Sequence, residues 1–351
     1  MTPSALEIVN QDIERILSED LPWDNLSGCS VAVTGASGFI GSYLTRTLLA
    51  LNSSGKVTQP IRVFGIVRNI NKAKERYVDI ADSPYFEIVE SDLCHPHTLA
   101  IQADWFIHAA SQASPKYYNI DPVGTLAPNV IGTYHLLQLA QKSQAKGFVF
   151  VSSSEIYGSV GDKTKLSESD LGVVDPLAIR SCYAESKRMG ETLCSAWSHQ
   201  YQLPTYIVRP FHTYGPLLEL NDGRVFADFV ADIVYDRDIV MTSDGSARRA
   251  FCYITDAMRG FFYILLKGQG GQAYNLANPA GDLSVLELAE LLVTLFSDKK
   301  LAVKKQPSSN ENYMNSHLMH LLPDVSKLSA LGWNPQVKCE EGFKRMVKSY
   351  L

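Results

Sequence analysis

Residues 30–41 of this chain read Ser30-Val-Ala-Val-Thr34-Gly35-Ala-Ser37-Gly38-Phe39-Ile40-Gly41, and this stretch decides the fold. Its first five residues carry no charge and include two valines and a threonine, which predicts a short buried strand. A glycine-rich turn follows, and then a helical run from Ser42 to Leu51. This strand–turn–helix order predicts a βα unit whose turn and helix start hold the phosphates of a dinucleotide.

Each glycine of the turn has an expected task. Gly35 permits the tight turn, Gly38 lets the backbone approach a pyrophosphate, and Gly41 lets the helix pack closely on the strand. The residues between these glycines are expected to complete the cofactor site: Ser37, Phe39 and Ile40. The alternative is a glycine-containing βα turn in an unrelated α/β protein.

A second strand, from Ile61 to Val67, ends at Arg68. In folds that bind NAD, an acidic residue commonly stands at this strand end and holds the adenosine ribose. An arginine there stacks on adenine or meets the 2′-phosphate of NADP. We therefore expect NAD as the cofactor and leave NADP open, and a solvated arginine without a ligand is an equal alternative.

Two further strands bring small and polar residues to the same edge of the sheet. The strand Phe86–Val89 leads to Asp92 and Leu93, where Asp92 can accept a hydrogen bond from the adenine amino group. The strand Trp105–Ala110 contains His108, which we interpret as a structural histidine. The last residues of this strand are small enough to lie against the cofactor: Ala109 and Ala110.

Length and composition fit a two-lobed enzyme that acts on a small molecule. Strands alternate with helices up to about residue 215 of 351, which predicts a doubly wound parallel sheet. The net charge is −5 without a basic run, so nucleic acid is not an expected partner. The chain shows no signal peptide and no run that could cross a membrane. Six scattered cysteines predict reduced thiols in the cytoplasm, with neither disulfides nor a metal site.

The expected domain organisation has three parts. Residues 1–27 form a helical extension, with a helix from about Ala5 to Leu17. Residues 28–215 form a Rossmann-like NAD(P)-binding domain of the α/β class. Residues 216–351 are mainly a smaller C-terminal substrate-binding domain, and part of about 250–280 returns to the first lobe.

Tyr183 and Lys187 carry the expected chemistry. They lie four residues apart in a segment rich in helix-forming residues, so they share one face of a helix. A free phenol has a pKa of about 10, and a neighbouring ammonium lowers that pKa toward neutrality. Such a phenol can take the proton of a sugar hydroxyl while a hydride leaves the same carbon. The spacing alone also occurs on exposed helices without any function.

The order of the motifs along the chain is informative about the protein family. A buried strand from Phe148 ends in Ser152-Ser153-Ser154-Glu155, which we expect beside Tyr183 at the carboxyl edge of the sheet. With the glycine turn, the Tyr-x-x-x-Lys pair and the segment 209–215, the chain from about residue 28 resembles the extended short-chain dehydrogenases that modify nucleotide sugars. This resemblance implies a nucleotide-sugar substrate and a homodimer formed through the helix of Tyr183.

Within this family the chain is most similar to the UDP-glucuronate decarboxylases, in segments 113–122, 221–225 and 245–253. The resemblance implies four catalytic residues: Ser153, Glu155, Tyr183 and Lys187. It implies six substrate contacts: Pro115, Tyr118, Ser154, His212, Arg224 and Arg249. The forks of the two arginines suit the oxygens of a diphosphate. Asn129 is expected to order the proton-relay region.

The implied reaction begins by oxidising the C4 hydroxyl of the sugar to a ketone. A C6 carboxylate then leaves as carbon dioxide, a C6 hydroxyl leaves as water, and with neither of these the ketone is reduced on its other face. We expect decarboxylation, because simple 4-epimerases generally lack a carboxylate at the position of Glu155. Many dTDP-glucose dehydratases have aspartate where Ser154 stands, and serine is a poor acid, which counts against dehydration but leaves it as an alternative beside epimerisation. A catalytically silent dinucleotide-sensing protein is the alternative of a different class.

Three residues depart from the decarboxylase pattern. His212 stands in place of the usual asparagine, Arg68 in place of an acidic residue, and Ser153 in place of threonine. The N-terminal extension and the stretch Pro307–Asn315 are interpreted as marks of a subfamily with a different sugar.

Overall fold

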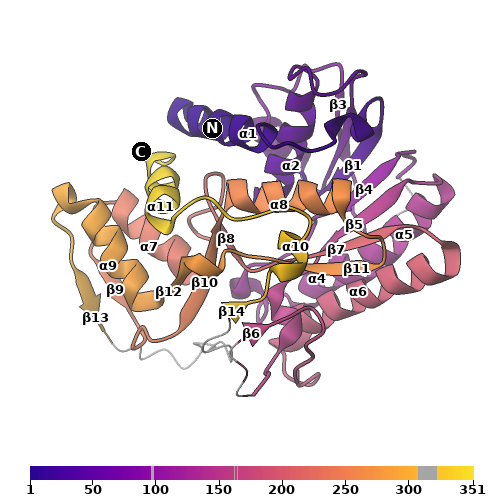
Figure 1. Cartoon of the computed structure of the whole chain (residues 1–351). Helices are drawn as coiled ribbons and strands as arrows, with labels where there is room; N and C mark the ends of the chain where they lie inside the picture. The colour runs from indigo at the N-terminus through magenta and orange to yellow at the C-terminus, as the bar shows by residue number, and fades with distance from the viewer. Residues whose placement is uncertain (96–98, 162, 164, 307–321) are drawn as a thin grey trace.

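The computed structural model shows two lobes that lie side by side (Figure 1). The larger lobe contains a long parallel sheet between helices, and the smaller lobe contains short strands and helices from the C-terminal part of the chain. The described residues are 1–95, 99–161, 163, 165–306 and 322–351. The stretch Pro307–Asn315 lies outside the described residues.

The larger lobe is built on a seven-stranded sheet in the order β11-β7-β5-β4-β1-β2-β3. Every neighbouring pair in this sheet is parallel, which confirms the predicted α/β class and the doubly wound sheet. The strands are β1 (Ser30–Thr34), β2 (Arg62–Val67), β3 (Phe86–Glu90), β4 (Trp105–His108), β5 (Gly147–Val151), β7 (Thr205–Pro210) and β11 (Gln272–Leu276).

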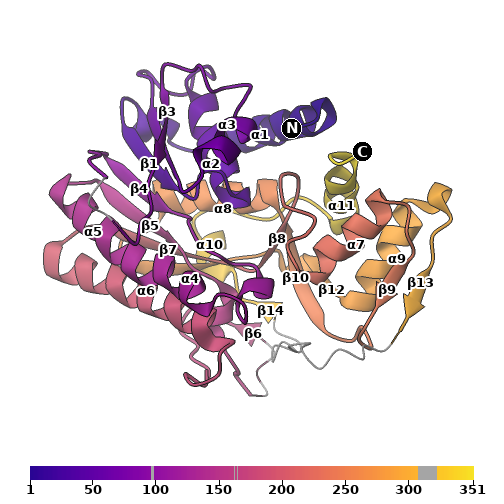
Figure 2. The same ribbon diagram turned by 180° about the vertical axis from the view of Figure 1, so that it is seen from behind.

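Helices cover both faces of this sheet, which is why its central strands are apolar along their whole length. One face carries α1 (Pro3–Leu17), α2 (Phe39–Leu51) and α8 (Ile254–Lys267), and α3 (Ile70–Arg76) follows β2. The other face carries α4 (Pro122–Ala127), α5 (Thr133–Lys142) and α6 (Ser181–Tyr201), as Figure 2 shows. A short π-helix (Pro128–Gly132) joins α4 to α5.

The strand order reverses at β1, which pairs with β2 on one side and with β4 on the other. Thr34 at the end of β1 is in register with Ile66 of β2 and with His108 of β4. In open parallel sheets, ligands bind outside the carboxyl ends of the strands at such a reversal. The topology therefore places the glycine turn after Thr34 at the expected ligand position.

The smaller lobe contains a three-stranded sheet, β12-β10-β8, and a pair, β13-β9. Its strands are β8 (His212–Tyr214), β9 (Ile239–Met241), β10 (Arg248–Tyr253), β12 (Asp282–Ser284) and β13 (Val303–Lys305). Its helices are α7 (Val225–Val234), α9 (Val285–Leu295) and α11 (Cys339–Lys348). Outside these sheets, β6 (Lys165–Leu166) pairs with β14 (Leu322–Pro323), and α10 (Ser326–Ser329) follows.

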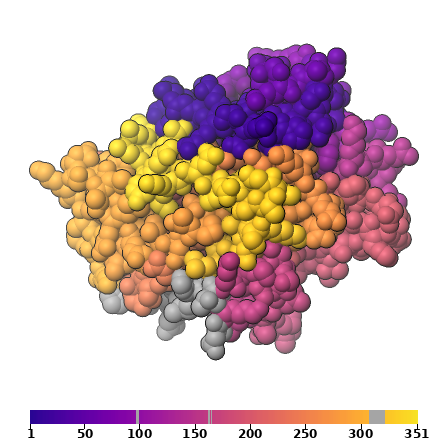
Figure 3. Space-filling model, viewed as in Figure 1, coloured from indigo at the N-terminus to yellow at the C-terminus, as the bar shows by residue number. Residues whose placement is uncertain are grey.

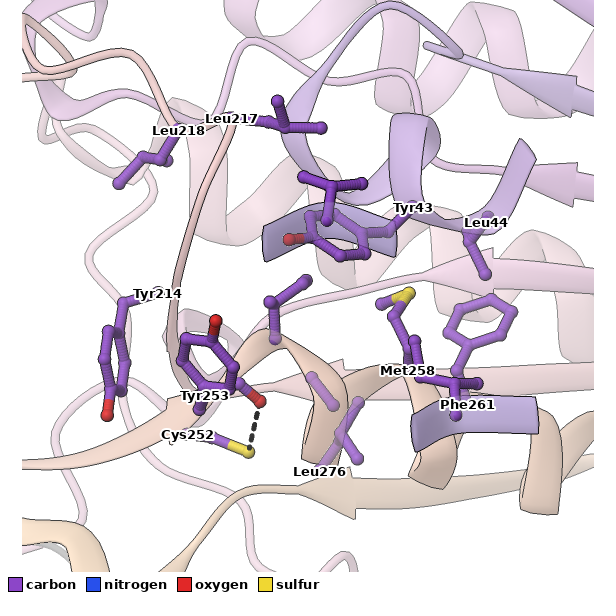
Figure 4. Packing of buried hydrophobic residues seen from close by; sticks show 14 of the residues in the cluster. Tyr43, Leu44, Tyr214, Leu217, Leu218, Cys252, Tyr253, Met258, Phe261 and Leu276 are labelled. Carbon is purple, nitrogen blue, oxygen red and sulfur yellow. Dashed lines mark hydrogen bonds between the residues drawn. The ribbon is translucent and has the colours of Figure 1, made fainter. Parts of the chain in front are cut away.

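The two lobes share one hydrophobic core. Figure 4 shows Tyr43 of α2 together with Tyr253, Met258 and Leu276, and all four belong to one cluster of buried side chains. The chain crosses from the smaller lobe into the larger one through α8, which is buried along most of its length, and through β11. The relative position of the lobes is therefore fixed by packing.

The N-terminal helix α1 ties the two ends of the chain together. Its prediction from the sequence is confirmed: the helix begins at Pro3, where the side chain of Thr2 caps it, and ends at Leu17. The carboxylate of Asp12 is buried and accepts hydrogen bonds from Tyr43 of α2, Tyr253 of β10 and Arg345 of α11. Figure 3 shows the N-terminal residues against the C-terminal ones on the surface.

In the part of the chain that the structure describes, no helix combines the length and apolar character that crossing a bilayer requires.

Candidate active site

A cleft of about 1940 Å³ runs between the carboxyl edge of the large sheet and the smaller lobe. It begins at the glycine turn, passes the helix of Tyr183 and ends against β10 of the smaller lobe. Most of the predicted site residues line it. They are Gly35, Gly38, Phe39, Ile40, Gly41, Arg68, Ala109, Pro115, Tyr118, Ser153, Ser154, Glu155, Tyr183, Lys187, His212, Arg224 and Arg249.

Four predicted cofactor residues do not line this cleft: Ser37, Asp92, Leu93 and Ala110. Asp92 accepts a hydrogen bond from the backbone of Cys94 (3.0 Å) and contacts His95. The side chain of Leu93 is buried in a second apolar cluster. Their part in cofactor binding stays a prediction.

The glycine turn has the shape that close approach to phosphates requires. Gly35 has φ +63°, and a Cβ there would lie 2.7 Å from the Cα of Ala110. A Cβ on Gly41 would lie only 2.2 Å from the carbonyl oxygen of Gly35. Gly38 is the N-cap of α2 and has no side chain to cap it, and the residues at this helix start line the cleft, where their N–H groups can receive a ligand. These residues fit the pyrophosphate of a dinucleotide.

His108 stabilises the start of this turn through hydrogen bonds. Burial lowers its pKa to about 3, so the imidazole is neutral and has a single N–H. Its Nε2 faces the carbonyl oxygen of Pro128 (3.1 Å), which can only accept, so Nε2 donates there and Nδ1 accepts from the hydroxyl of Thr34 (2.8 Å). Thr34 in turn accepts from the N–H of Ala110 (3.1 Å). The interpretation of His108 as a structural histidine is confirmed.

Tyr183 lies in the first turn of α6 and is almost completely buried (6% exposed). Its ring stacks on that of Tyr118, with ring centroids 5.2 Å apart. Burial raises the pKa of Tyr183 to about 12, while a hydrogen bond with Ser153 acts in the opposite direction and Glu155 raises the pKa further.

Lys187 lies one turn further along α6, on the same face as predicted, and it is fully buried. Its Nζ donates to the carbonyl oxygen of Val151 (2.7 Å) and lies 5.8 Å from the ring centroid of Tyr183. Burial lowers the pKa of Lys187 to about 7, against an opposing effect of Glu191.

The lowered pKa expected for Tyr183 is not found in this structure, where burial raises it, and an effect of Lys187 on this pKa stays a prediction. Both side chains are buried, and burial disfavours the phenolate and the ammonium alike. The pattern of the sequence gives the spacing of the pair but not the loss of solvent around it.

Asn129 connects the π-helix to this pair. Its amide donates to the hydroxyl of Ser186 (3.0 Å), and Ser186 donates to the backbone oxygen of Tyr183 (2.8 Å). Asn129 thus fixes the turn of α6 that carries the phenol, while its part in a proton relay stays a prediction.

The end of β5 supplies the other reactive groups. Ser153 begins a short 3₁₀ turn, and its hydroxyl accepts from the N–H of Glu155 (3.2 Å). The carboxylate of Glu155 forms an ion pair with Arg180 (3.6 Å), and both side chains line the cleft. The reactive end of the cleft therefore contains a phenol, a hydroxyl, a carboxylate and a guanidinium.

The smaller lobe contributes cations to the opposite wall. Arg224 pairs with Asp222, and Arg249 donates to the carbonyl oxygen of Arg248 (2.7 Å). Between them, His212 is held neutral, because burial lowers its pKa well below the usual value and both arginines add to this effect. Its Nδ1 is buried without a hydrogen-bond partner among the residues that the structure describes. This wall suits an anionic group such as a diphosphate.

Several residues of the cleft were missed by the sequence reasoning. Arg180 is the clearest case, since it stands three residues before Tyr183 and thus one helical turn away on the same face. Lys72 and Arg76 also line the cleft, at the helical spacing after Arg68. Asp222 stands two residues before Arg224, a spacing that carries no signal of pairing.

The doubly wound sheet, the glycine turn at its reversal and the Tyr-Lys pair define a nicotinamide-dinucleotide enzyme of the Rossmann type. Residues 31–277 match the model of the NAD dependent epimerase/dehydratase family. The chain belongs to this family, which confirms the resemblance stated above. Because the family is NAD dependent, the expected NAD cofactor is confirmed for the family.

Curated relatives and solved structures agree with this membership. UDP-glucuronic acid decarboxylase 6 of Arabidopsis thaliana is 33% identical over 92% of this chain and 89% of its own length. Among solved structures, DesIV, a dTDP-glucose 4,6-dehydratase from Streptomyces venezuelae with NAD and TYD bound, is 25% identical. It covers 92% of this chain and 96% of its own, with a TM-score of 0.78.

A further solved structure is similar in fold. It is the UDP-glucuronic acid 4-epimerase from Bacillus cereus in complex with UDP-glucuronic acid and NAD. It has a TM-score of 0.77 at 23% identity and covers 92% of this chain and 98% of its own.

Proposed function

We propose that this chain is a UDP-glucuronate decarboxylase that oxidises C4 of the sugar, releases carbon dioxide and reduces C4 again. The observation that carries the proposal is the grouping of Ser153, Glu155 and Tyr183 at one end of a cleft that begins at the glycine turn. The identity to a named decarboxylase over nearly the whole chain supports the same reaction.

The proposed reaction begins at Tyr183, which takes the proton of the C4 hydroxyl while Ser153 holds the same oxygen. A bound dinucleotide supplies the hydride acceptor for C4, later the hydride donor, and in its oxidised form a positive charge that favours the phenolate. Lys187 is anchored by its hydrogen bond to the carbonyl oxygen of Val151. When it is protonated, it adds positive charge near the ring of Tyr183.

The second step follows from the ketone at C4. The C5–C6 bond breaks, carbon dioxide leaves, and the electron pair becomes an enolate whose oxygen receives hydrogen bonds from Ser153 and Tyr183. The carboxylate of Glu155 takes a proton from solvent, delivers it to C5 and so returns to its ionised form. Hydride returns to C4 and the proton of Tyr183 returns to the C4 oxygen, which gives the pentose.

Arg180 is proposed to reduce the repulsion between the carboxylate of Glu155 and the carboxylate of the substrate. Without it, the carboxylate of Glu155 would face the carboxylate of the substrate, and like charges repel. The ion pair of Arg180 with Glu155 places a cation at the point where both carboxylates meet. On the opposite wall, Arg224 and Arg249 are proposed to bind the diphosphate, with His212, Pro115, Tyr118 and Ser154 completing the substrate site.

We also propose that the two lobes bind different ligands. Residues 28–215 would hold the dinucleotide and residues 216–351 mainly the nucleotide sugar. Support comes from the cleft, whose lining includes the glycine turn on one side and β10 on the other. Reaction in the cytoplasm is proposed because all six cysteines are free thiols.

A homodimer is proposed through the outer face of α4, the π-helix, α5 and α6. Large apolar side chains are exposed there on neighbouring helices: Val123, Ile131, Tyr134 and Met189. Sedimentation of the wild type and of Met189→Asp tests this proposal, since the charge should convert a dimer into a monomer. A monomeric wild type at micromolar concentration would contradict it.

Dehydration is the second candidate, because Glu155 could instead remove the C5 proton of a sugar with a C6 hydroxyl. The deciding experiment offers the purified protein UDP-glucuronate and, separately, UDP-, dTDP-, CDP- and GDP-hexoses. Mass spectrometry distinguishes the classes by a loss of about 44 mass units for carbon dioxide, about 18 for water, or no change for epimerisation. Decarboxylation of UDP-glucuronate supports the proposal, and turnover of only the neutral hexoses overturns it. If no sugar nucleotide binds or reacts while NAD(H) alters a partner contact, the chain is a sensing protein.

A further inference from the structure

The wall of the cleft at the end of β2 is unusually rich in cations. Arg68, Lys72 and Arg76 all line the cleft, and no carboxylate stands at the strand end. Lys72 pairs with Glu219. Arg68 and Arg76 form no side-chain hydrogen bond or ion pair with any residue in the described ranges. Within the described residues, two guanidinium groups therefore line the cleft without a hydrogen bond or ion pair, and Glu219 acts on Arg76 only at longer range.

The local backbone holds these three cations on one side. Asn69 caps α3 by accepting from the N–H of Lys72 (3.0 Å), so the helix begins directly after Arg68. Arg76 then follows Lys72 by four residues and shares its face of the helix. Arg76 is only partly exposed, and this burial lowers the pKa of its guanidinium.

The acidic groups near this wall are already engaged. Glu219 holds Lys72, and Glu90 at the end of β3 accepts from the N–H of Ile70 (3.3 Å). Glu90 does not line the cleft. A ligand that enters here therefore meets an excess of positive charge.

The position of this wall identifies the part of the ligand that it meets. In dinucleotide folds the residue at the end of the second strand contacts the ribose of the adenosine, where an acidic residue selects NAD and an arginine accommodates a 2′-phosphate. The planar forks of Arg68 and Arg76 match two or three oxygens of a phosphate, and a charge-assisted bond of this kind is about twice as strong as a neutral one.

We propose that Arg68, Lys72 and Arg76 form a binding site for the 2′-phosphate of the adenosine ribose, so that this member of an NAD-dependent family binds NADP in preference to NAD. The inference rests on the proposed function only in that the cleft holds a nicotinamide dinucleotide. The hydride chemistry is the same for both cofactors, and the added phosphate anchors the far end of the molecule.

The test measures binding and needs no turnover. The full-length protein, freed of bound nucleotide, is titrated with NADP+ and with NAD+ by isothermal titration calorimetry. We expect NADP+ to bind at least about ten-fold more tightly, which corresponds to ~1.4 kcal/mol. Arg68→Asp should remove this preference by weakening NADP+ alone, and added salt should reduce it as well.

Lys74→Ala is the matched control, because Lys74 is an exposed cation of the same helix that does not line the cleft. It should leave both dissociation constants unchanged. Equal or tighter binding of NAD+ by the wild type overturns the proposal, and so does an unchanged ratio in Arg68→Asp. A protein that prefers NADP+ but leaves UDP-glucuronate intact contradicts the proposed reaction and not this site.

Discussion

The ammonium of Lys187 lies 5.8 Å from the ring centroid of Tyr183, and its hydrogen bond goes to the carbonyl oxygen of Val151. Burial raises the pKa of the phenol to about 12 and lowers that of the lysine to about 7. Near neutral pH, Tyr183 is therefore protonated until a ligand favours its phenolate, while Lys187 is close to its midpoint. The lysine is the pH-sensitive member of this pair.

The buried lysine should make the stability of the fold depend on pH. Its pKa is 10.5 in the unfolded chain and about 7 in the folded one, so between these values the unfolded state binds more protons. The free energy of unfolding should then rise with pH across this window, by up to about 1.4 kcal/mol per pH unit. Urea titrations of the wild type and of Lys187→Met measure it, and the variant should lack the rise. Lys142→Met, at an exposed lysine, is the control, and parallel curves for wild type and Lys187→Met would contradict the assignment.

Replacing Glu155 by glutamine should separate the two halves of the reaction. The oxidation of C4 depends on Tyr183, whereas the step after it needs the proton carried by Glu155. We expect overall turnover to fall by about 10²–10⁴-fold, with reduced nicotinamide accumulating in stopped-flow absorbance. Glu185→Gln, which alters a carboxylate paired with Arg188 outside the cleft, should leave turnover unchanged. Equal losses in oxidation and in the later step would remove Glu155 from this role.

Two alanine substitutions in the glycine turn should have different effects. In Gly41→Ala the new Cβ would lie 2.2 Å from the backbone oxygen of Gly35, which cannot move aside. We expect a loss of at least ~1–3 kcal/mol of stability, the usual cost of overpacking. In Gly38→Ala the nearest atom is 3.1 Å away, so the protein should fold but bind the dinucleotide more weakly. Thermal unfolding and nucleotide titration test both, and equal stability of the two variants would refute the close packing at Gly41.

The buried carboxylate of Asp12 should be important for stability. Asp12→Ala leaves the hydroxyls of Tyr43 and Tyr253 and the guanidinium of Arg345 without their shared partner. Breaking a buried charge network in this way costs about 3–5 kcal/mol. Urea unfolding measures the loss, with Glu14→Ala on the exposed side of the same helix as the control. A difference below that of the control would show that α1 does not stabilise the junction.

The fold was predictable wherever a signal is local. Short runs rich in apolar and β-branched residues predicted the strands, and glycines before a helical run predicted the turn that follows Thr34. The site was predictable where its residues lie at strand ends or at helical spacing, as for Ser153, Tyr183 and Lys187. These features depend on residues that are close together in the sequence, so local sequence patterns are enough to predict them.

What could not be predicted depends on contacts between distant segments. The bonds of Asp12 to Tyr253 and Arg345 span 241 and 333 residues, and no local pattern encodes them. The direction of the pKa shift at Tyr183 depends on burial by the whole fold, so the spacing to Lys187 gave the wrong sign. The pairing of Arg180 with Glu155 likewise appears only once β5 and α6 lie side by side.

The central claim is that Tyr183 moves the proton of the C4 hydroxyl as hydride leaves that carbon. The most direct measurement mixes UDP-glucuronate with the cofactor-loaded Tyr183→Phe protein and follows reduced-nicotinamide absorbance in a stopped-flow instrument. The variant retains the ring that stacks on Tyr118, and its binding of both ligands is checked by titration. We predict that both ligands bind and that the transient absorbance of the wild type disappears. A transient of unchanged size and rate in the variant would contradict the account.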